Sequence, residues 1–100
     1  MNGKQVKEAI GEAAMLEMLA EEATELAHAA LKLARKIRNQ NPTPVDYEEL
    51  YSHLDEESAD VRLCMTYLHD IECIRIRNVI NIFSKKDKRF EERLEESRGK

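Results

Sequence analysis

The chain has no tryptophan, only two prolines and three glycines, and only five aromatic residues among its 100. Scarce glycine and proline beside abundant alanine, leucine and charged residues are typical of a mostly helical protein. No run of 18 apolar residues is present, so the sequence predicts no membrane-spanning segment. The N-terminal Met1-Asn2-Gly3-Lys4 leads into no apolar stretch, so we expect no signal peptide and a cytoplasmic location.

Cysteine is also rare: Cys64 and Cys73 are the only two, and both fall within helical pattern. Without a secretion signal, we interpret them as reduced packing residues rather than a disulfide or a cysteine metal site. The net charge of −4 argues against binding a nucleic-acid polymer, which favours basic patches. One hundred residues predict a single domain with a thin core, which association with further copies would strengthen.

Apolar residues spaced three and four apart predict a first helical region from about Lys4 to about Arg38. Gly11 lies within it and predicts a bend or a separate first helix. The segment 39–44, with Pro42 and Pro44, predicts a break, because proline disfavours helix at the preceding residue. The predicted apolar stripe of this first region is Leu16, Leu19, Ala23, Leu26, Ala30, Leu33 and Ile37.

A second helical region is predicted to begin at Asp46, whose spacing to Glu49 resembles a capping box. A turn at 69–70, with Asp70 as N-cap, then leads into a third helix from about Ile71 to about Glu95, and residues 95–100 are expected to fray. We expect an all-α antiparallel helical bundle of three to four helices in one domain over residues 1–100. The second stripe is Tyr47, Leu50, Leu54, Glu57, Val61, Cys64, Leu68 and Ile71.

Two acidic motifs recur 35 residues apart, in 19–26 and 54–61, and each has two adjacent acids followed by a third acid three residues on. Residues three apart share a helix face, about 4.5 Å apart along the axis. Glu22 and Glu25 therefore form one pair, and Glu57 and Asp60 form another. Four carboxylates facing one another across two antiparallel helices would repel, so a hard divalent cation, Mg²⁺ or Mn²⁺, is the expected counter-charge.

Glu57 occupies a position at which the second stripe calls for an apolar residue. An ionised carboxylate in such a place is costly unless something compensates it. A metal ion would do so; the alternative is a salt bridge to Lys32, Arg35 or Arg38. The matching acidic pair in the first motif favours the metal interpretation.

Three basic residues, Lys86, Arg89 and Arg93, cluster beside the apolar stripe of the third predicted helix. That stripe is Ile76, Val79, Ile80, Phe83, Phe90 and Leu94. Arginine offers a bidentate fork for phosphate oxygens. Cations near a helix C-terminus also interact favourably with the helix dipole. The spacing alone favours this structural role over phosphate binding.

Histidines give a weaker signal than the acids. Glu25 and His28 have the Glu-x-x-His spacing of di-iron bundles, which need two such units. The second acidic motif has no histidine three residues after Asp60. We therefore interpret His28, His53 and His69 as packed or surface residues.

With these motifs in hand, the chain resembles the MazG-like, all-α nucleoside triphosphate pyrophosphohydrolases. The hallmark of that family is Glu-x-x-Glu on one helix and Glu-x-x-Asp on the next. Here the motifs read Glu22-Ala23-Thr24-Glu25 and Glu57-Ser58-Ala59-Asp60. The strings 19–32 and 41–44 also look like the short, single-domain members, and the similarity spans roughly 15–94.

The resemblance implies a helical protomer that forms a homodimer or homotetramer to complete its active sites. It implies hydrolysis of a nucleoside triphosphate to the monophosphate and pyrophosphate, with ions that neutralise phosphate oxygens and activate water. One of the four motif acids, or the neighbouring Glu21, is the candidate general base. The implied Mg²⁺ or Mn²⁺ ligands are Glu22, Glu25, Glu57 and Asp60. The implied phosphate-binding residues are Lys86, Arg89 and Arg93.

Other interpretations stay open at this stage. Arg62 interrupts the apolar run that usually follows the second motif, and a phosphoribosyl-ATP type of substrate fits a related architecture. A non-catalytic helical dimer acting as an interaction or regulatory module would also explain the long apolar stripes. A di-iron bundle would depend on His28.

Overall fold

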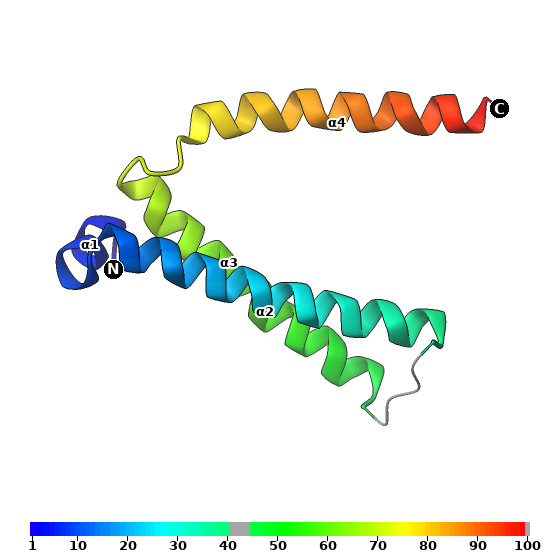
Figure 1. Ribbon diagram of the computed structural model, residues 1–100, viewed down its shortest axis with the longest axis horizontal. Coiled ribbons are helices and arrows are strands. Elements are labelled where there is room, and N and C mark those ends of the chain that lie inside the picture. The colour runs from blue at the N-terminus through cyan, green and yellow to red at the C-terminus, as the bar shows by residue number, and fades with distance from the viewer. Residues whose placement is uncertain (41–44, 100) are drawn as a thin grey trace.

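The computed structural model describes residues 1–40 and 45–99, and within these ranges it contains helices and no strands. The predicted all-α class is therefore confirmed, whereas the predicted break at residues 41–44 lies outside the described residues. No helix in the described part of the chain is long and apolar enough to cross a membrane. The helices are α1 (Gly3–Ile10), α2 (Glu12–Arg38), α3 (Tyr47–Asp70) and α4 (Ile76–Arg98) (Figure 1).

Two helix boundaries follow the sequence signals. Gly11 separates α1 from α2 with φ of +85°, a left-handed value that suits glycine. The Asp46 side chain caps α3 by accepting a hydrogen bond from the Glu49 amide at 2.9 Å. The predicted bend at Gly11 and the predicted cap at Asp46 are therefore both confirmed.

Asp70 is not the N-cap that its sequence context predicts. Asp70 is the last residue of α3, and the N-cap position of α4 is Arg75. The Asp70 carboxylate instead accepts a hydrogen bond of 2.7 Å from the Gly3 amide, 67 residues earlier. A side chain at Gly3 would collide with the backbone oxygen of Tyr67, so this close approach of α1 to α3 requires glycine.

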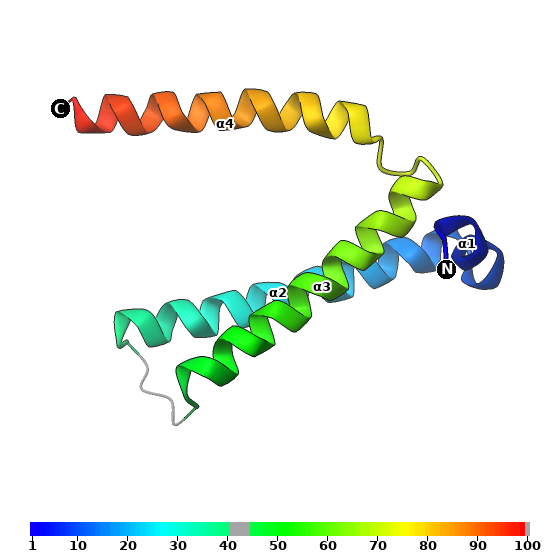
Figure 2. The ribbon, with the colours of Figure 1, turned by 180° about the vertical axis from the view of Figure 1, so that it is seen from behind.

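The long helices α2 and α3 form an antiparallel pair, and they lie side by side from both viewing directions (Figures 1 and 2). The short helix α1 packs across one end of this pair. There Val6, Met15 and Leu68 form a buried apolar cluster. The remaining buried apolar residues of the described chain are Ala29, Leu33, Leu50 and Cys64.

Leu19, Leu26 and Leu33 of the predicted stripe lie on the inner face of α2, whereas the other predicted positions are exposed. Leu16 and Ile37 were expected inside, yet they are 43% and 59% exposed. At the positions that differ, the inner face carries Met15, Glu22 and Ala29, so it is less apolar than the predicted stripe. This face places Glu22 rather than Ala23 toward α3. The observed inner face comprises Met15, Leu19, Glu22, Leu26, Ala29 and Leu33.

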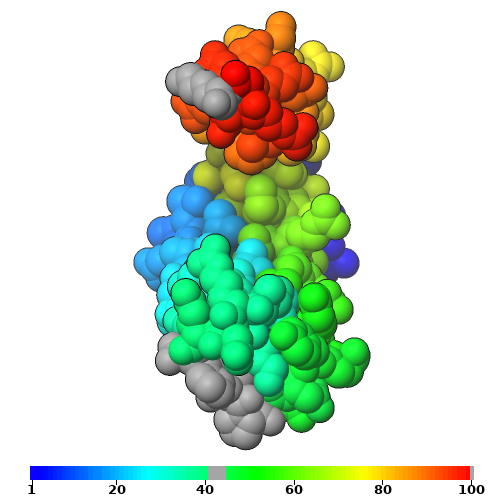
Figure 3. Space-filling view, turned by 90° about the vertical axis from the view of Figure 1, so that its right-hand side faces the viewer, coloured from blue at the N-terminus to red at the C-terminus, as the bar shows by residue number. Residues whose placement is uncertain are grey.

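The fourth helix projects from the helix pair and has no buried residue. The space-filling view shows it as a separate lobe, in orange and red, above the helix pair (Figure 3). The radius of gyration is 17.5 Å, against about 13 Å for a compact domain of this length. The chain therefore leaves an amphipathic helix uncovered, with these exposed apolar residues: Ile76, Val79, Ile80, Ile82, Phe83, Phe90 and Leu94.

Candidate metal centre

Three of the predicted acids meet between α2 and α3. One carboxylate oxygen from each of Glu22, Glu25 and Glu57 lies within 4.8 Å of the other two. The spacing along α2 puts Glu22 and Glu25 on one face, and the antiparallel pairing brings Glu57 opposite them. We call Glu22, Glu25, Glu57 and Asp60 the acidic cluster.

The acidic cluster runs from the interior to the surface. Glu57 is only 8% exposed, Glu22 is half-buried, and Glu25 and Asp60 are exposed. Along α3, Glu57 lies between the buried Leu50 and Cys64. The cluster is therefore a polar interruption of the helix–helix interface that opens to solvent on one side.

Burial and mutual repulsion make the inner carboxylates hard to ionise. Loss of hydration raises the pKa of Glu22, and the charges of Glu25, Asp60 and Glu57 raise it further. A hydrogen bond with Asp60 acts in the same direction. Two carboxyl groups can share a hydrogen bond only when one holds a proton, so without a cation the cluster tends to retain protons.

Burial and repulsion also act on Glu57, which is more deeply buried than Glu22. Loss of hydration raises its pKa first, followed by a hydrogen bond to Glu25 and the charges of Glu25 and Asp60. The charge of His53 acts in the opposite direction. The net effect is a raised pKa, so the interior favours either a proton or a cation at this carboxylate.

Two oxygen atoms of the cluster are buried without a partner. Within residues 1–40 and 45–99, Glu22 Oε2 and Glu57 Oε2 accept no hydrogen bond. An unpaired buried acceptor is unfavourable unless a ligand satisfies it. Unpaired carboxylate oxygens converging from two helices fit Mg²⁺ or Mn²⁺, which prefer oxygen ligands. The donor set therefore suits the ion that the resemblance implies.

Glu57 does not form the salt bridge that offered the simpler explanation of its position. Among the described residues its ionic partner is His53, whose Nε2 lies 3.3 Å from Glu57 Oε1. Lys32, Arg35 and Arg38 make no such contact with it. His53 was interpreted from sequence as a packed or surface residue; its spacing of four residues before Glu57 is the signal that could have placed it at the cluster.

Cys64 lies beside the acidic cluster as a buried free thiol. Loss of hydration and the charges of Glu22 and Asp60 raise its pKa. A raised pKa keeps the sulfur protonated and poorly nucleophilic. Both cysteines are free, as predicted, and Cys64 serves as a packing residue at the edge of the cluster.

The remaining predicted site residues are not part of this group. Glu21 is exposed on α2 next to Glu22, and His28 is exposed one turn beyond Glu25. The basic residues lie on α4, which stands apart from the helix pair in Figures 1 and 3. The protomer thus assembles the acids but does not bring these residues to them: Lys86, Arg89 and Arg93.

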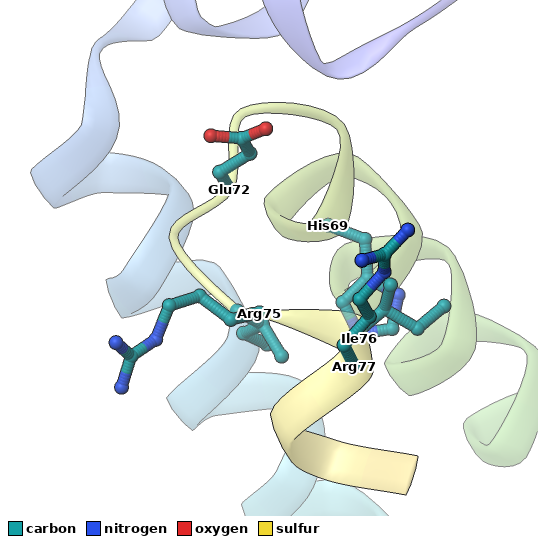
Figure 4. A pocket seen from close by; sticks show the side chains of 6 residues that line it. His69, Glu72, Arg75, Ile76 and Arg77 are labelled. Carbon is teal, nitrogen blue, oxygen red and sulfur yellow. The ribbon is translucent and has the colours of Figure 1, made fainter.

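A hollow of about 350 Å³ lies where α3 passes into α4 (Figure 4). It contains none of the acids that the sequence singled out. His69 contributes to its wall, and the Nε2 atom of His69 is buried without a hydrogen-bond partner in the described chain. The lining residues are His69, Glu72, Ile74, Arg75, Ile76 and Arg77.

Comparisons of the chain with protein-family models, with curated proteins and with solved structures find no match. The MazG-like resemblance therefore stands on the two acidic motifs. The case for a function rests on the geometry of the acidic cluster.

The raised pKa values predict how stability depends on pH when no metal is present. The folded protein binds protons at Glu22 and Glu57 more tightly than the unfolded chain does. The contribution of these carboxyls to stability is complete below the ordinary glutamate pKa and is lost as pH rises through the raised values. We expect the melting temperature in EDTA to fall as the pH rises above the ordinary glutamate pKa of 4.5.

A variant without the Glu22 charge provides the control for this pH dependence. Glu22→Gln has no carboxyl to ionise at that position, so its melting temperature should fall less over the same range. Thermal melts of the two proteins in EDTA measure the difference. Curves that stay parallel from acid to neutral pH would contradict the predicted titration.

Proposed function

We propose that the protein is a Mg²⁺-dependent pyrophosphohydrolase that cleaves a nucleoside triphosphate to its monophosphate and pyrophosphate. The observation that carries the proposal is the convergence of three carboxylates within 4.8 Å, one of them 8% exposed and with an unpaired oxygen. Such a site is unfavourable without a cation. A divalent ion that completes it has a natural partner in the phosphate chain of a nucleotide.

The carboxylates supply the ligands, with Glu22, Glu25 and Glu57 as the inner set and Asp60 beside Glu22. When bound, Mg²⁺ neutralises phosphate oxygens and lowers the pKa of coordinated water. The exposed acids at the open side of the cluster are placed to accept a proton from an attacking water. Glu25, Asp60 and Glu21 are the candidates for that general base, because all three reach solvent.

The proposal includes a homodimer or homotetramer. The protomer buries few apolar side chains, while Phe83 and Phe90 on α4 are 69% and 61% exposed. A second copy offers matching apolar positions on its helix pair, where Leu16 and Leu63 are 43% and 51% exposed. Packing α4 there would also bring positive charge toward the acid-rich helices.

Association of this kind gives the basic residues of α4 a role that they lack in the isolated protomer. Lys86, Arg89 and Arg93 lie beside the apolar face of α4 in sequence, so they would line the edge of the contact. There they would approach the phosphates of a nucleotide bound at the partner copy's acidic cluster. Their positive charge would stabilise the negative charge of the leaving pyrophosphate.

A second candidate function is a non-catalytic helical module that acts through α4. The exposed apolar face of this helix favours it, because an uncovered amphipathic helix marks an interaction surface. This alternative predicts that neither Mg²⁺ nor nucleotides stabilise the protein. It also predicts that the acids of the cluster can be replaced without loss of function.

The deciding experiment is an assay of a panel of nucleoside and deoxynucleoside triphosphates with Mg²⁺ and with EDTA. We expect Mg²⁺-dependent formation of monophosphate and pyrophosphate in equal amounts. The variant Glu22→Ala/Asp60→Ala should be inactive, because it removes one ligand from each helix. The matched control Glu17→Ala/Asp55→Ala removes the same residue types from exposed positions of the same helices and should stay active.

Three results would decide against this function. Diphosphate and inorganic phosphate as products would place cleavage at the wrong bond. Activity in EDTA would remove the role of the ion. Equal activity of the two double variants would separate catalysis from the acidic cluster.

A further inference from the structure

His53 stands out because it contacts the most buried acid of the cluster without belonging to the group of potential ligands. Its Nε2 atom lies 3.3 Å from Glu57 Oε1. The group of atoms within 4.8 Å of one another comprises only the carboxylates of Glu22, Glu25 and Glu57. His53 thus touches the cluster from outside.

The two oxygens of Glu57 therefore have different surroundings. Oε1 faces His53, whereas Oε2 is buried and unpaired. The spacing of four residues on α3 stacks the two side chains, and helical side chains lean toward the N-terminus, so Glu57 reaches back to His53. One oxygen contacts His53, and the other is buried within the acidic cluster without a hydrogen-bond partner in the described chain.

We infer that His53 is a positioning residue that holds the Glu57 carboxylate through the 3.3 Å contact of its Nε2 atom with Oε1, so that Oε2 is presented to a divalent cation. This inference rests on the proposed metal site and assigns a further residue to it. Ligating carboxylates are commonly fixed by a second hydrogen-bonded partner, and loss of such a partner weakens metal binding about 10- to 100-fold. The side chain of His53 is 40% exposed, so it contributes little to the packed core.

The role can be tested by measuring Mn²⁺ binding to the full-length chain with electron paramagnetic resonance of the free ion. His53→Leu removes the donor while keeping a side chain of similar bulk that favours helix. We expect Mn²⁺ to bind this variant about 10- to 100-fold more weakly than the wild type. His53→Gln places an amide nitrogen near the original Nε2 position and should recover most of the affinity.

Two measurements separate positioning from a structural effect. Melting temperatures in EDTA should be nearly the same for the wild type and both His53 variants, because His53 is partly exposed. The control His28→Leu removes an exposed histidine near Glu25 that has no contact with the acids in the described structure, and it should bind Mn²⁺ like the wild type.

Each outcome bears on a definite part of the inference. Wild-type affinity in His53→Leu would overturn the positioning role and leave the metal site intact. Equal weakness of His53→Gln and His53→Leu would overturn the contact of a side-chain nitrogen with Glu57 as its cause. Absence of Mn²⁺ binding by the wild type would overturn both the role of His53 and the proposed function.

Discussion

Replacing Glu57 with glutamine is expected to raise the thermal stability of the metal-free protein and to abolish its stabilisation by Mg²⁺ or Mn²⁺. In the wild type, Glu57 is 8% exposed, lies among other acids and has an unpaired oxygen. Glutamine of the same shape removes the charge that resists burial. It also removes a metal ligand. The substitution therefore stabilises the metal-free protein and removes the additional stability that a bound ion would give.

The expected effect of the ion on the wild type is large. An ion present at 100 times its Kd stabilises the folded state by about 2.7 kcal/mol, a rise in melting temperature on the order of 10 °C for a domain of this size. Glu57→Gln should show almost none of this rise. Its turnover of the best nucleotide should fall by about 10²- to 10³-fold, because metal assistance is worth several kcal/mol in the transition state.

The neighbouring acid provides the control. Glu56→Gln makes the same chemical change at an exposed position of α3. It should respond to Mg²⁺ as the wild type does and should keep its turnover. A Glu57→Gln protein that is destabilised in EDTA, or that Mg²⁺ still stabilises fully, would show that Glu57 is an ordinary buried carboxylate.

Replacing Phe83 and Phe90 with lysine is expected to convert the proposed oligomer into a monomer. Both side chains are largely exposed in the protomer, so the substitutions remove little intramolecular packing. Any loss of association therefore reports on contacts between copies. Light scattering coupled to gel filtration measures the mass directly, and nucleotide turnover should fall with it if the basic residues of α4 act on the partner copy.

The same experiment has a matched control on the other side of α4. Asn78→Lys/Asn81→Lys adds the same charge on the face of α4 away from Phe83 and Phe90 and should keep the oligomer. Circular dichroism adds a second readout, because most helical stability in proteins comes from tertiary packing and α4 buries no residue in the protomer. A wild type that is monomeric and fully helical at all concentrations would contradict the role proposed for α4.

The sequence predicts the helices well because their signals are local. The cap at Asp46 and the break at Gly11 each depend on residues within a few positions, and both appear in the structure. Glu57 was recognised because a charged residue interrupted an otherwise apolar stripe. These features need no knowledge of what packs against the helix.

Other features depend on contacts that periodicity does not contain. On α2, Leu19, Leu26 and Leu33 face inward as predicted. Glu22 lies inward where the apolar pattern favours Ala23, because it meets Glu57 of the other helix. Asp70 was misassigned because its partner, the Gly3 amide, is 67 residues away in sequence. His53 was missed although its spacing to Glu57 was visible, since the same spacing is common on solvated helix surfaces.

The hydrogen bond between Gly3 and Asp70 bears on the order in which the chain folds. Closing the α2–α3 hairpin joins segments that follow one another directly, whereas docking α1 onto α3 must bring together positions 67 residues apart. Contacts between nearby segments lose less chain entropy and are expected to form earlier. Repulsion among the acids would then oppose the first long-lived contact of the folding chain, and a divalent ion would speed folding rather than merely slow unfolding.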